Sequence, residues 1–130
     1  MAQILIVEDE RIVKNLLTTI LRRKYTVRQA RDADEADRIC QDTHFEVVIA
    51  DVNLTKSRSG TDFAVGLIRR QPNIRVLFIS GLRVENWQQK DTENLGRIPV
   101  SSYSVLHKPL SPEVLLDAVD SLFTSIERHE

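Results

Sequence analysis

The chain has 130 residues, of which 42% are apolar and 28% charged, and its 18 basic residues against 19 acidic ones leave a net charge of -1. This length and composition predict one soluble domain over residues 1–130, and the balanced charge argues against a domain that contacts nucleic acid directly. The longest apolar runs are quartets such as Ile4-Leu5-Ile6-Val7, far short of the ~20 residues that a membrane span needs. With one cysteine, Cys40, the chain cannot form an internal disulfide, so a cytoplasmic location is expected.

The first predicted element is a continuous apolar run at residues 3–7, which is typical of a strand buried on both faces. Apolar residues at helical spacing then predict a helix that ends near Lys24 and turns one apolar stripe toward the core: Ile12, Val13, Leu16, Leu17, Ile20 and Leu21. A strand at residues 25–29 and a shorter helix at residues 32–41 are predicted to follow.

The alternation continues through the second half of the chain. The predicted elements are, in order, a strand at residues 46–50, a helix around 63–68, a strand at 74–79, a helix near 84–94, a strand at 103–107 and a helix from Pro112 almost to the end. The helix near 84–94 has the weakest pattern, because only Val84, Trp87 and Leu95 could face a core, and we expect Trp87 to be partly exposed. Ser111 is the expected N-cap of the last helix.

Five strands alternating with five helices predict an α/β fold with right-handed crossovers, a parallel sheet and helices on both faces. In this fold ligands bind at the carboxyl ends of the strands, where the sequence places Glu8-Asp9-Glu10, Asp51, Ser80 and Lys108-Pro109. Carboxylates from neighbouring strand ends repel one another unless a cation lies between them, and hard oxygen ligands favour Mg²⁺. A hydroxyl and an ammonium nearby would supply the hydrogen bond and the positive charge that a transferred phosphoryl group needs.

This constellation resembles the receiver domain of two-component response regulators over nearly the whole chain. The matching pieces are Ile4-Leu5-Ile6-Val7-Glu8-Asp9-Glu10, Val47-Val48-Ile49-Ala50-Asp51, Val76-Leu77-Phe78-Ile79-Ser80-Gly81 and Lys108-Pro109-Leu110. The resemblance implies a flavodoxin-like, doubly wound sheet of five parallel strands in the order 2-1-3-4-5, with five helices on its two faces.

The resemblance also implies that Asp51 accepts a phosphoryl group from a sensor histidine kinase or a histidine phosphotransfer protein. Ser80 would be the switch hydroxyl, and Lys108, which precedes a cis bond to Pro109, would bind the phosphoryl oxygens. The implied function is a phosphorylation-dependent switch in a phosphorelay. Asp51 and Lys108 would catalyse phosphoryl uptake and loss within the chain, so no turnover of a separate substrate is expected.

The implied cofactor is Mg²⁺. Asp9 and Asp51 would coordinate the ion directly, together with the backbone carbonyl of Asn53. Glu8 would act largely through water. These groups crowd negative charge at one end of the sheet, and such crowding also favours Mg²⁺.

Three positions depart from the usual receiver pattern. Thr55 replaces a proline, Gly60 comes nine residues after Asp51 where eight are usual, and Val105 replaces the switch aromatic. Because valine has no ring to rotate, we predict that the signal travels through residues 81–95, which show few core anchors. The expected output surface, for a downstream protein or a second copy, is the face formed by the fourth helix, the fifth strand and the last helix.

Two alternatives stay open at this stage. An aspartyl-phosphate hydrolase of the haloacid dehalogenase type would need a second aspartate two residues after the nucleophile, and Asn53 occupies that position. A pseudo-receiver would bind partners without phosphorylation, and the presence of both Asp51 and Lys108 argues against it.

Overall fold

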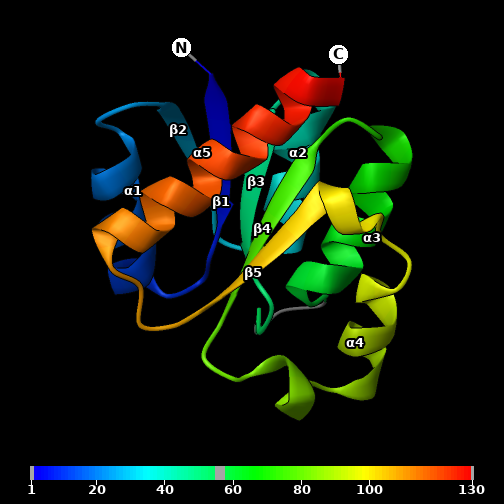
Figure 1. Cartoon of the computed structure of the whole chain (residues 1–130). Helices are drawn as coiled ribbons and strands as arrows, with labels where there is room; N and C mark the ends of the chain where they lie inside the picture. The colour runs from blue at the N-terminus through cyan, green and yellow to red at the C-terminus, as the bar shows by residue number, and fades with distance from the viewer. Residues whose placement is uncertain (1, 55–57, 130) are drawn as a thin grey trace.

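The computed structural model describes residues 2–54 and 58–129. Five parallel strands form one sheet in the order β2-β1-β3-β4-β5, with helices on both faces (Figure 1), which confirms the predicted fold. The strands are β1 (Gln3–Val7), β2 (Thr26–Ala30), β3 (Val47–Asp51), β4 (Arg75–Ser80) and β5 (Tyr103–His107). The helices are α1 (Arg11–Leu21), α2 (Ala33–Asp42), α3 (Gly60–Arg70), α4 (Gln89–Leu95) and α5 (Pro112–His129), with short 3₁₀ turns η1 (Val84–Asn86) and η2 (Val100–Ser102).

The strands are continuous apolar runs because helices cover both faces of the sheet. Ile4 and Ile6 of β1 belong to the core cluster shared with α1 and α5. Leu5 and Val7, whose side chains alternate with those of Ile4 and Ile6, belong to the cluster shared with α2, α3 and α4. All four side chains are fully buried, and this double burial is the reason for the apolar pattern.

Helix α1 is shorter than predicted and exposes part of its apolar stripe. It ends at Leu21 instead of near Lys24. Leu17 is buried, whereas Ile12 is 83% exposed and Leu16 is 52% exposed. Ile12 and Leu16 lie one turn apart on the same side of the helix, about 140° and about 100° around the axis from Leu17. The prediction that all six stripe residues face the core is therefore wrong.

The chain between β4 and β5 differs from the single helix predicted near residues 84–94. The turn η1 is followed by two residues outside any helix before α4 begins. Trp87 has an extended backbone, with a ψ of 159°, and its indole nitrogen donates to the Leu82 carbonyl at 3.0 Å. Its side chain is 8% exposed, so the expectation of a partly exposed tryptophan is also wrong. The helix is interrupted because Trp87 turns into the core.

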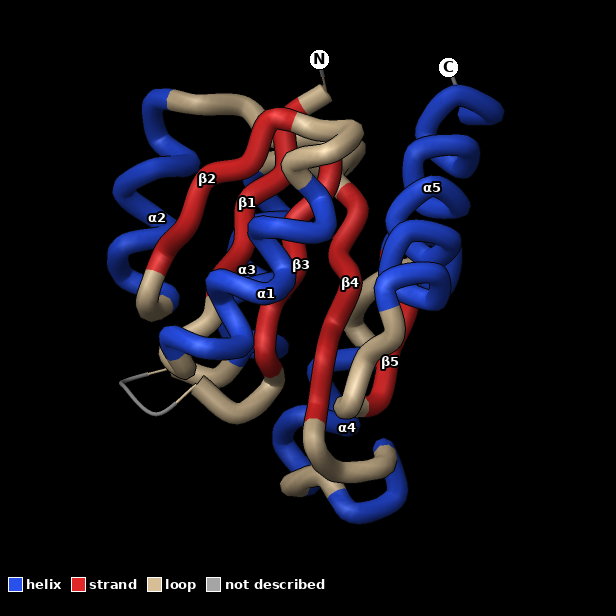
Figure 2. The backbone as a smooth tube through the Cα atoms, turned by 90° about the vertical axis from the view of Figure 1, so that its left-hand side faces the viewer, coloured by secondary structure: helices blue, strands red, loops and turns tan. Residues whose placement is uncertain are grey.

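The carboxyl ends of the strands lie together at one end of the sheet, next to α4 and the start of α3 (Figure 2). The last helix begins as predicted, because the Ser111 hydroxyl accepts a hydrogen bond from the backbone nitrogen of Val114 at 3.2 Å. In the described part of the chain, no helix has the length and apolar character needed to cross a membrane.

Candidate functional site

Three acidic residues gather where β1 and β3 end. Val7 of β1 pairs with Ala50 of β3, so the residues that follow them, Glu8 and Asp51, are neighbours across the sheet. Together with Asp9, each offers a carboxylate oxygen, and these oxygens all lie within 4.8 Å of one another. The sequence predicted this gathering, because parallel strands end at the same edge of the sheet.

Glu8 is the least satisfied member of this acidic group. Its side chain is fully buried, and neither carboxylate oxygen accepts a hydrogen bond from the described residues. Burial, and then the neighbouring Asp51 carboxylate, raise the pKa of Glu8 to about 8. A buried acid without donors is costly unless a cation compensates it. The donor set, three carboxylates with hard oxygen atoms, therefore fits Mg²⁺.

Lys108 supplies the positive charge of the site. Its ammonium lies 3.1 Å from Asp51 Oδ2, 3.5 Å from Glu8 Oε1 and 3.9 Å from Glu10 Oε1. Burial lowers the pKa of Lys108, but the hydrogen bond to Asp51 and the surrounding carboxylates outweigh it and raise the pKa above its ordinary value. The Lys108-Pro109 peptide bond is cis.

Asp51 is held from two sides. Its Oδ1 accepts a hydrogen bond from the backbone nitrogen of Asn53 at 2.9 Å, and its Oδ2 accepts one from Lys108. Asp51 is buried, with only 3% of its surface exposed. The carboxylate is therefore held in one orientation by groups from two separate loops.

Ser80 ends β4 and is fully buried. Its hydroxyl accepts a hydrogen bond from the backbone nitrogen of Leu82 at 3.0 Å, while its carbonyl accepts one from the backbone nitrogen of Lys108 at 2.8 Å. The hydroxyl is thus tied to the loop that leads toward α4. In this way Ser80 connects the end of the sheet that carries Asp51 with the segment that follows β4.

Val105 occupies the position of the missing aromatic. It pairs with Phe78 of β4 and packs, half-buried, against the core cluster on the α3 side of the sheet. Tyr103, on the same face, places its ring centroid 6.1 Å from that of Phe78. The valine is thus part of the packed core.

One sequence expectation about the loops needs correction. Residues 81–95 are not poorly anchored, because Trp87 and Leu95 are buried in the core cluster and two polar residues of α4, Asp91 and Asn94, are buried as well. The burial of Asp91 and Asn94 was not predicted from the sequence. A partial signal was present in Ser59 and Asp62, whose spacing is that of a capping box and which form one in the structure.

The loop after β3 is described only in part. Thr55, the residue in place of the usual proline, lies outside the described residues. At the end of the loop, Arg58 forms ion pairs with Asp34 at 3.1 Å and with Asp37, both on α2. This arginine therefore joins the loop to α2.

Comparisons with known proteins agree with this architecture. The sequence profile of the response regulator receiver domain matches residues 4–120. The aerobic respiration control protein ArcA of Escherichia coli K12 is 29% identical over 113 residues, which cover 86% of this chain and 44% of ArcA. The chain thus spans less than half the length of that relative.

Solved structures show the same fold. A CheY-like receiver domain protein from Methanospirillum hungatei has a TM-score of 0.87 at 20% identity and covers 100% of this chain and 99% of its own. NtrX from Brucella abortus has a TM-score of 0.81 at 28% identity and covers 99% of this chain and 29% of its own.

Proposed function

Because the chain belongs to the response regulator receiver domain family, we propose that it is a phosphorylation-dependent switch in which Asp51 accepts a phosphoryl group. Receiver domains belong to two-component signalling systems, and their phosphoryl donors are histidine kinases or phosphotransfer proteins. The observation that carries the proposal is the Asp51 carboxylate, which lies beside Glu8 and Asp9 and 3.1 Å from the Lys108 ammonium.

The proposed transfer needs one nucleophile and charge compensation. An Asp51 carboxylate oxygen attacks the phosphorus of a phosphohistidine, the new O–P bond forms as the donor's N–P bond breaks, and the electron pair stays on the imidazole nitrogen. Lys108, already bound to Asp51 Oδ2, neutralises charge on the phosphoryl oxygens. The backbone nitrogen of Asn53 holds Oδ1 and leaves the carboxylate in a fixed orientation.

Receiver domains bind Mg²⁺ in an acidic pocket, and we propose that Glu8, Asp9 and Asp51 hold it here, with the Asn53 carbonyl as a further ligand. The support is the buried Glu8 side chain, whose oxygens accept no hydrogen bond from the described residues. When bound, Mg²⁺ would neutralise charge on the phosphoryl oxygens during transfer. Between transfers, the same ion would relieve the repulsion among the three carboxylates.

An apolar groove beside the site supports docking of a protein donor. Four α1 residues, Val13, Leu16, Leu17 and Ile20, line a cavity of about 340 Å³ together with Lys108, Pro109 and Leu110. Lys108 borders both this groove and Asp51. A donor helix with apolar side chains that sits in the groove would therefore bring its phosphohistidine to the phosphoacceptor.

The first experiment incubates the chain with acetyl phosphate and Mg²⁺ and measures its intact mass. We expect one added phosphoryl group that is lost at alkaline pH, and none on Asp51→Asn. If the wild-type chain takes up nothing, the phosphorylation-independent pseudo-receiver becomes the better proposal. If it releases phosphate with rapid turnover, an aspartyl-phosphate hydrolase becomes the better one.

A second experiment tests the groove. Leu16→Glu places a charge in the groove at an exposed position, so the fold is expected to tolerate it. Phosphoryl transfer from a phosphorylated histidine protein should slow, while uptake from acetyl phosphate should be unchanged. Equal slowing with both donors would contradict donor docking on α1.

We further propose that residues 1–130 act as one receiver domain without turnover of a separate substrate, and that it works in the cytoplasm. The face of α4, β5 and α5 is the proposed output surface, for a downstream protein or a second copy. Among the residues of these three elements, Val114 of α5 is an exposed apolar side chain, which a partner could cover.

A further inference from the structure

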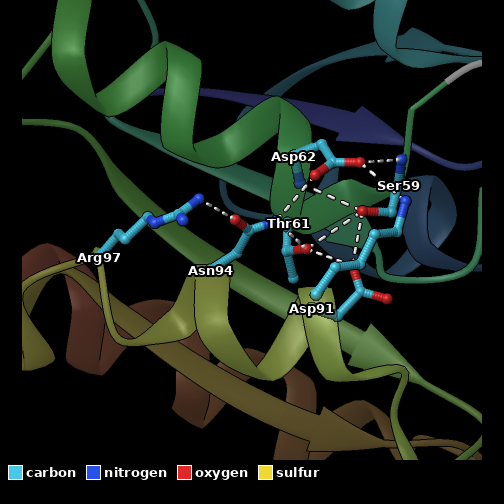
Figure 3. A network of polar contacts seen from close by, with 7 residues as sticks. Ser59, Thr61, Asp62, Asp91, Asn94 and Arg97 are labelled. Atoms are coloured by element: carbon cyan, nitrogen blue, oxygen red, sulfur yellow. Dashed lines mark hydrogen bonds and ion pairs between the residues drawn. The ribbon is translucent and has the colours of Figure 1, made fainter.

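Buried polar side chains join the N-terminus of α3 to α4 (Figure 3). Asp91 of α4 accepts hydrogen bonds from the hydroxyls of Ser59, at 2.7 Å, and Thr61. Asn94, on the same side of α4, donates to Thr61 Oγ1 at 3.1 Å and to Asp62 Oδ1 at 2.8 Å. We call these five residues the α3–α4 clasp.

The clasp supplies buried polar contacts that hold α4 against α3. Helix α4 has seven residues, and Leu95 is its one apolar residue. Such a helix cannot be positioned by an apolar face alone. Asp91 and Asn94, in contrast, are buried and bonded to α3. Because a buried polar group that loses its partner is costly, these hydrogen bonds favour one position of α4.

The clasp also lies directly against the phosphoacceptor strand. Between Ser59 and Thr61, the Gly60 nitrogen donates to the Val52 carbonyl at 3.2 Å. A methyl group at Gly60 would lie 2.2 Å from the carbonyl oxygen of Asp51, so only glycine permits this approach. The backbone that follows Asp51 is therefore in direct contact with the first turn of α3, and a shift of this backbone toward α3 would displace that turn.

A second connection reaches α4 from Ser80. The Ser80 hydroxyl accepts from the Leu82 nitrogen, and the Leu82 carbonyl accepts from the Trp87 indole. If the hydroxyl turns toward a phosphoryl group on Asp51, its hydrogen bond to Leu82 is disturbed. Helix α4 is thus linked to the phosphorylation site at both the α3 side and the β4 side.

From these contacts we propose that the α3–α4 clasp positions α4 in the unphosphorylated protein, and that opening of the clasp transmits phosphorylation of Asp51 to α4. This inference rests on the proposed phosphorylation of Asp51. In this structure the hydrogen bonds of the clasp are formed, and we call this arrangement closed. In the proposed route, phosphorylation weakens these hydrogen bonds. Phosphorylation then lowers the stability of the closed position relative to an open one.

The test compares three threonine variants of the full chain. Thr61→Val removes the hydroxyl that serves both Asp91 and Asn94 and keeps a similar shape. Thr61→Ser keeps the hydroxyl, so it should behave as the wild type. Thr92→Val is the matched control, because Thr92 lies on α4 and is exposed. Amide exchange of residues 89–95 is measured with Mg²⁺, with and without beryllofluoride as phosphoryl mimic, and ¹⁹F NMR measures adduct formation.

In the wild type, Thr61→Ser and Thr92→Val, beryllofluoride should speed exchange in α4 about tenfold or more. In Thr61→Val, exchange should already be fast without the mimic and change less than about threefold, although the adduct forms. Rescue by serine separates the hydroxyl's role from general packing. If Thr61→Val does not fold, Asn94→Ala opens the same clasp from α4 and should give the same result.

The inference is overturned if Thr61→Val responds like the wild type. It is also overturned if the wild-type adduct forms without any change in α4, an outcome that leaves the phosphorylation proposal standing. If no adduct forms on the wild-type chain, the proposed function fails and the inference fails with it. The ¹⁹F signal distinguishes these two failures.

Discussion

Two buried carboxylates, Glu8 and Asp91, lie at the same end of the sheet, and they differ in their hydrogen bonds. In the acidic group, Glu8 is buried beside Asp51, and its oxygens accept no hydrogen bond from the described residues. In the clasp, Asp91 accepts hydrogen bonds from the hydroxyls of Ser59 and Thr61. Burial of a carboxylate therefore does not by itself mark a binding site. The Glu8 carboxylate, which accepts no hydrogen bond from the described residues, favours a cation nearby, whereas the hydrogen-bonded Asp91 carboxylate joins α4 to α3.

The largest expected effect comes from Lys108, the cation of the acidic group. Lys108→Ala should slow phosphoryl uptake from acetyl phosphate by about 10²- to 10³-fold, because the phosphoryl oxygens lose their compensating charge. Lys108→Arg should also be slow, since a planar guanidinium does not replace a compact ammonium. Initial rates by intact mass measure both, with Lys24→Ala as a control at a lysine paired with Asp120. A fully active arginine variant would contradict a tight site.

Glu8 should make the metal-free protein less stable as pH rises. Its pKa is about 8 in the folded chain and 4.5 as the ordinary value. Between these values the folded chain binds a proton that the unfolded chain has lost. The free energy of unfolding should therefore fall by roughly 1 kcal/mol per pH unit across that interval. Below pH 4.5 the contribution of Glu8 to the free energy of unfolding is fully present, and it is lost as the pH rises through 8.

Urea unfolding in EDTA at several pH values tests this dependence. Glu8→Gln cannot titrate, so its stability should vary less between pH 5 and 8 than that of the wild type. Saturating Mg²⁺ should reduce the wild-type loss, because binding favours the ionised form. An unchanged slope in Glu8→Gln would show that another group causes it.

A substitution at Asp9 tests whether Mg²⁺ is bound by a specific ligand or by general negative charge. Asp9→Asn should weaken Mg²⁺ binding by about 10- to 100-fold, because a charged oxygen ligand becomes a neutral one. Glu10→Gln is the matched control, since Glu10 is exposed and is not part of the acidic group. Calorimetric titration with Mg²⁺ gives both affinities. Equal losses in the two variants would mean that general negative charge, not a specific ligand, binds the ion.

The smallest expected effect concerns the stability that the clasp provides. Thr61→Val should lower the free energy of unfolding by about 1–3 kcal/mol, because Asp91 and Asn94 each lose a buried hydrogen bond. Thr92→Val should change it by less than about 0.5 kcal/mol. Urea unfolding followed by Trp87 fluorescence measures the difference. Equal effects would show that the hydroxyl at Thr61 is not needed for packing α3 against α4.

The sheet could be predicted closely from the sequence. The predicted ranges of β1 and β5 agree with the observed bounds, and those of β2, β3 and β4 are shifted by one residue. Strands buried on both faces require continuous apolar runs, and that requirement is visible in the sequence. The helix predicted near residues 84–94 exists, but α4 begins only at Gln89, because Trp87 interrupts the helix and its indole donates to the Leu82 carbonyl, a contact that periodicity does not reveal.

The sequence by itself determined the order of the elements and placed Glu8, Asp51, Ser80 and Lys108 at strand ends. A parallel sheet brings those ends to one edge whatever the details of packing. Only the tertiary structure decided how the charges there are satisfied, as in the bond between Thr61 and Asp91, which lie 30 residues apart. Such bonds depend on how two helices meet, and short polar side chains carry no periodic pattern that would indicate it.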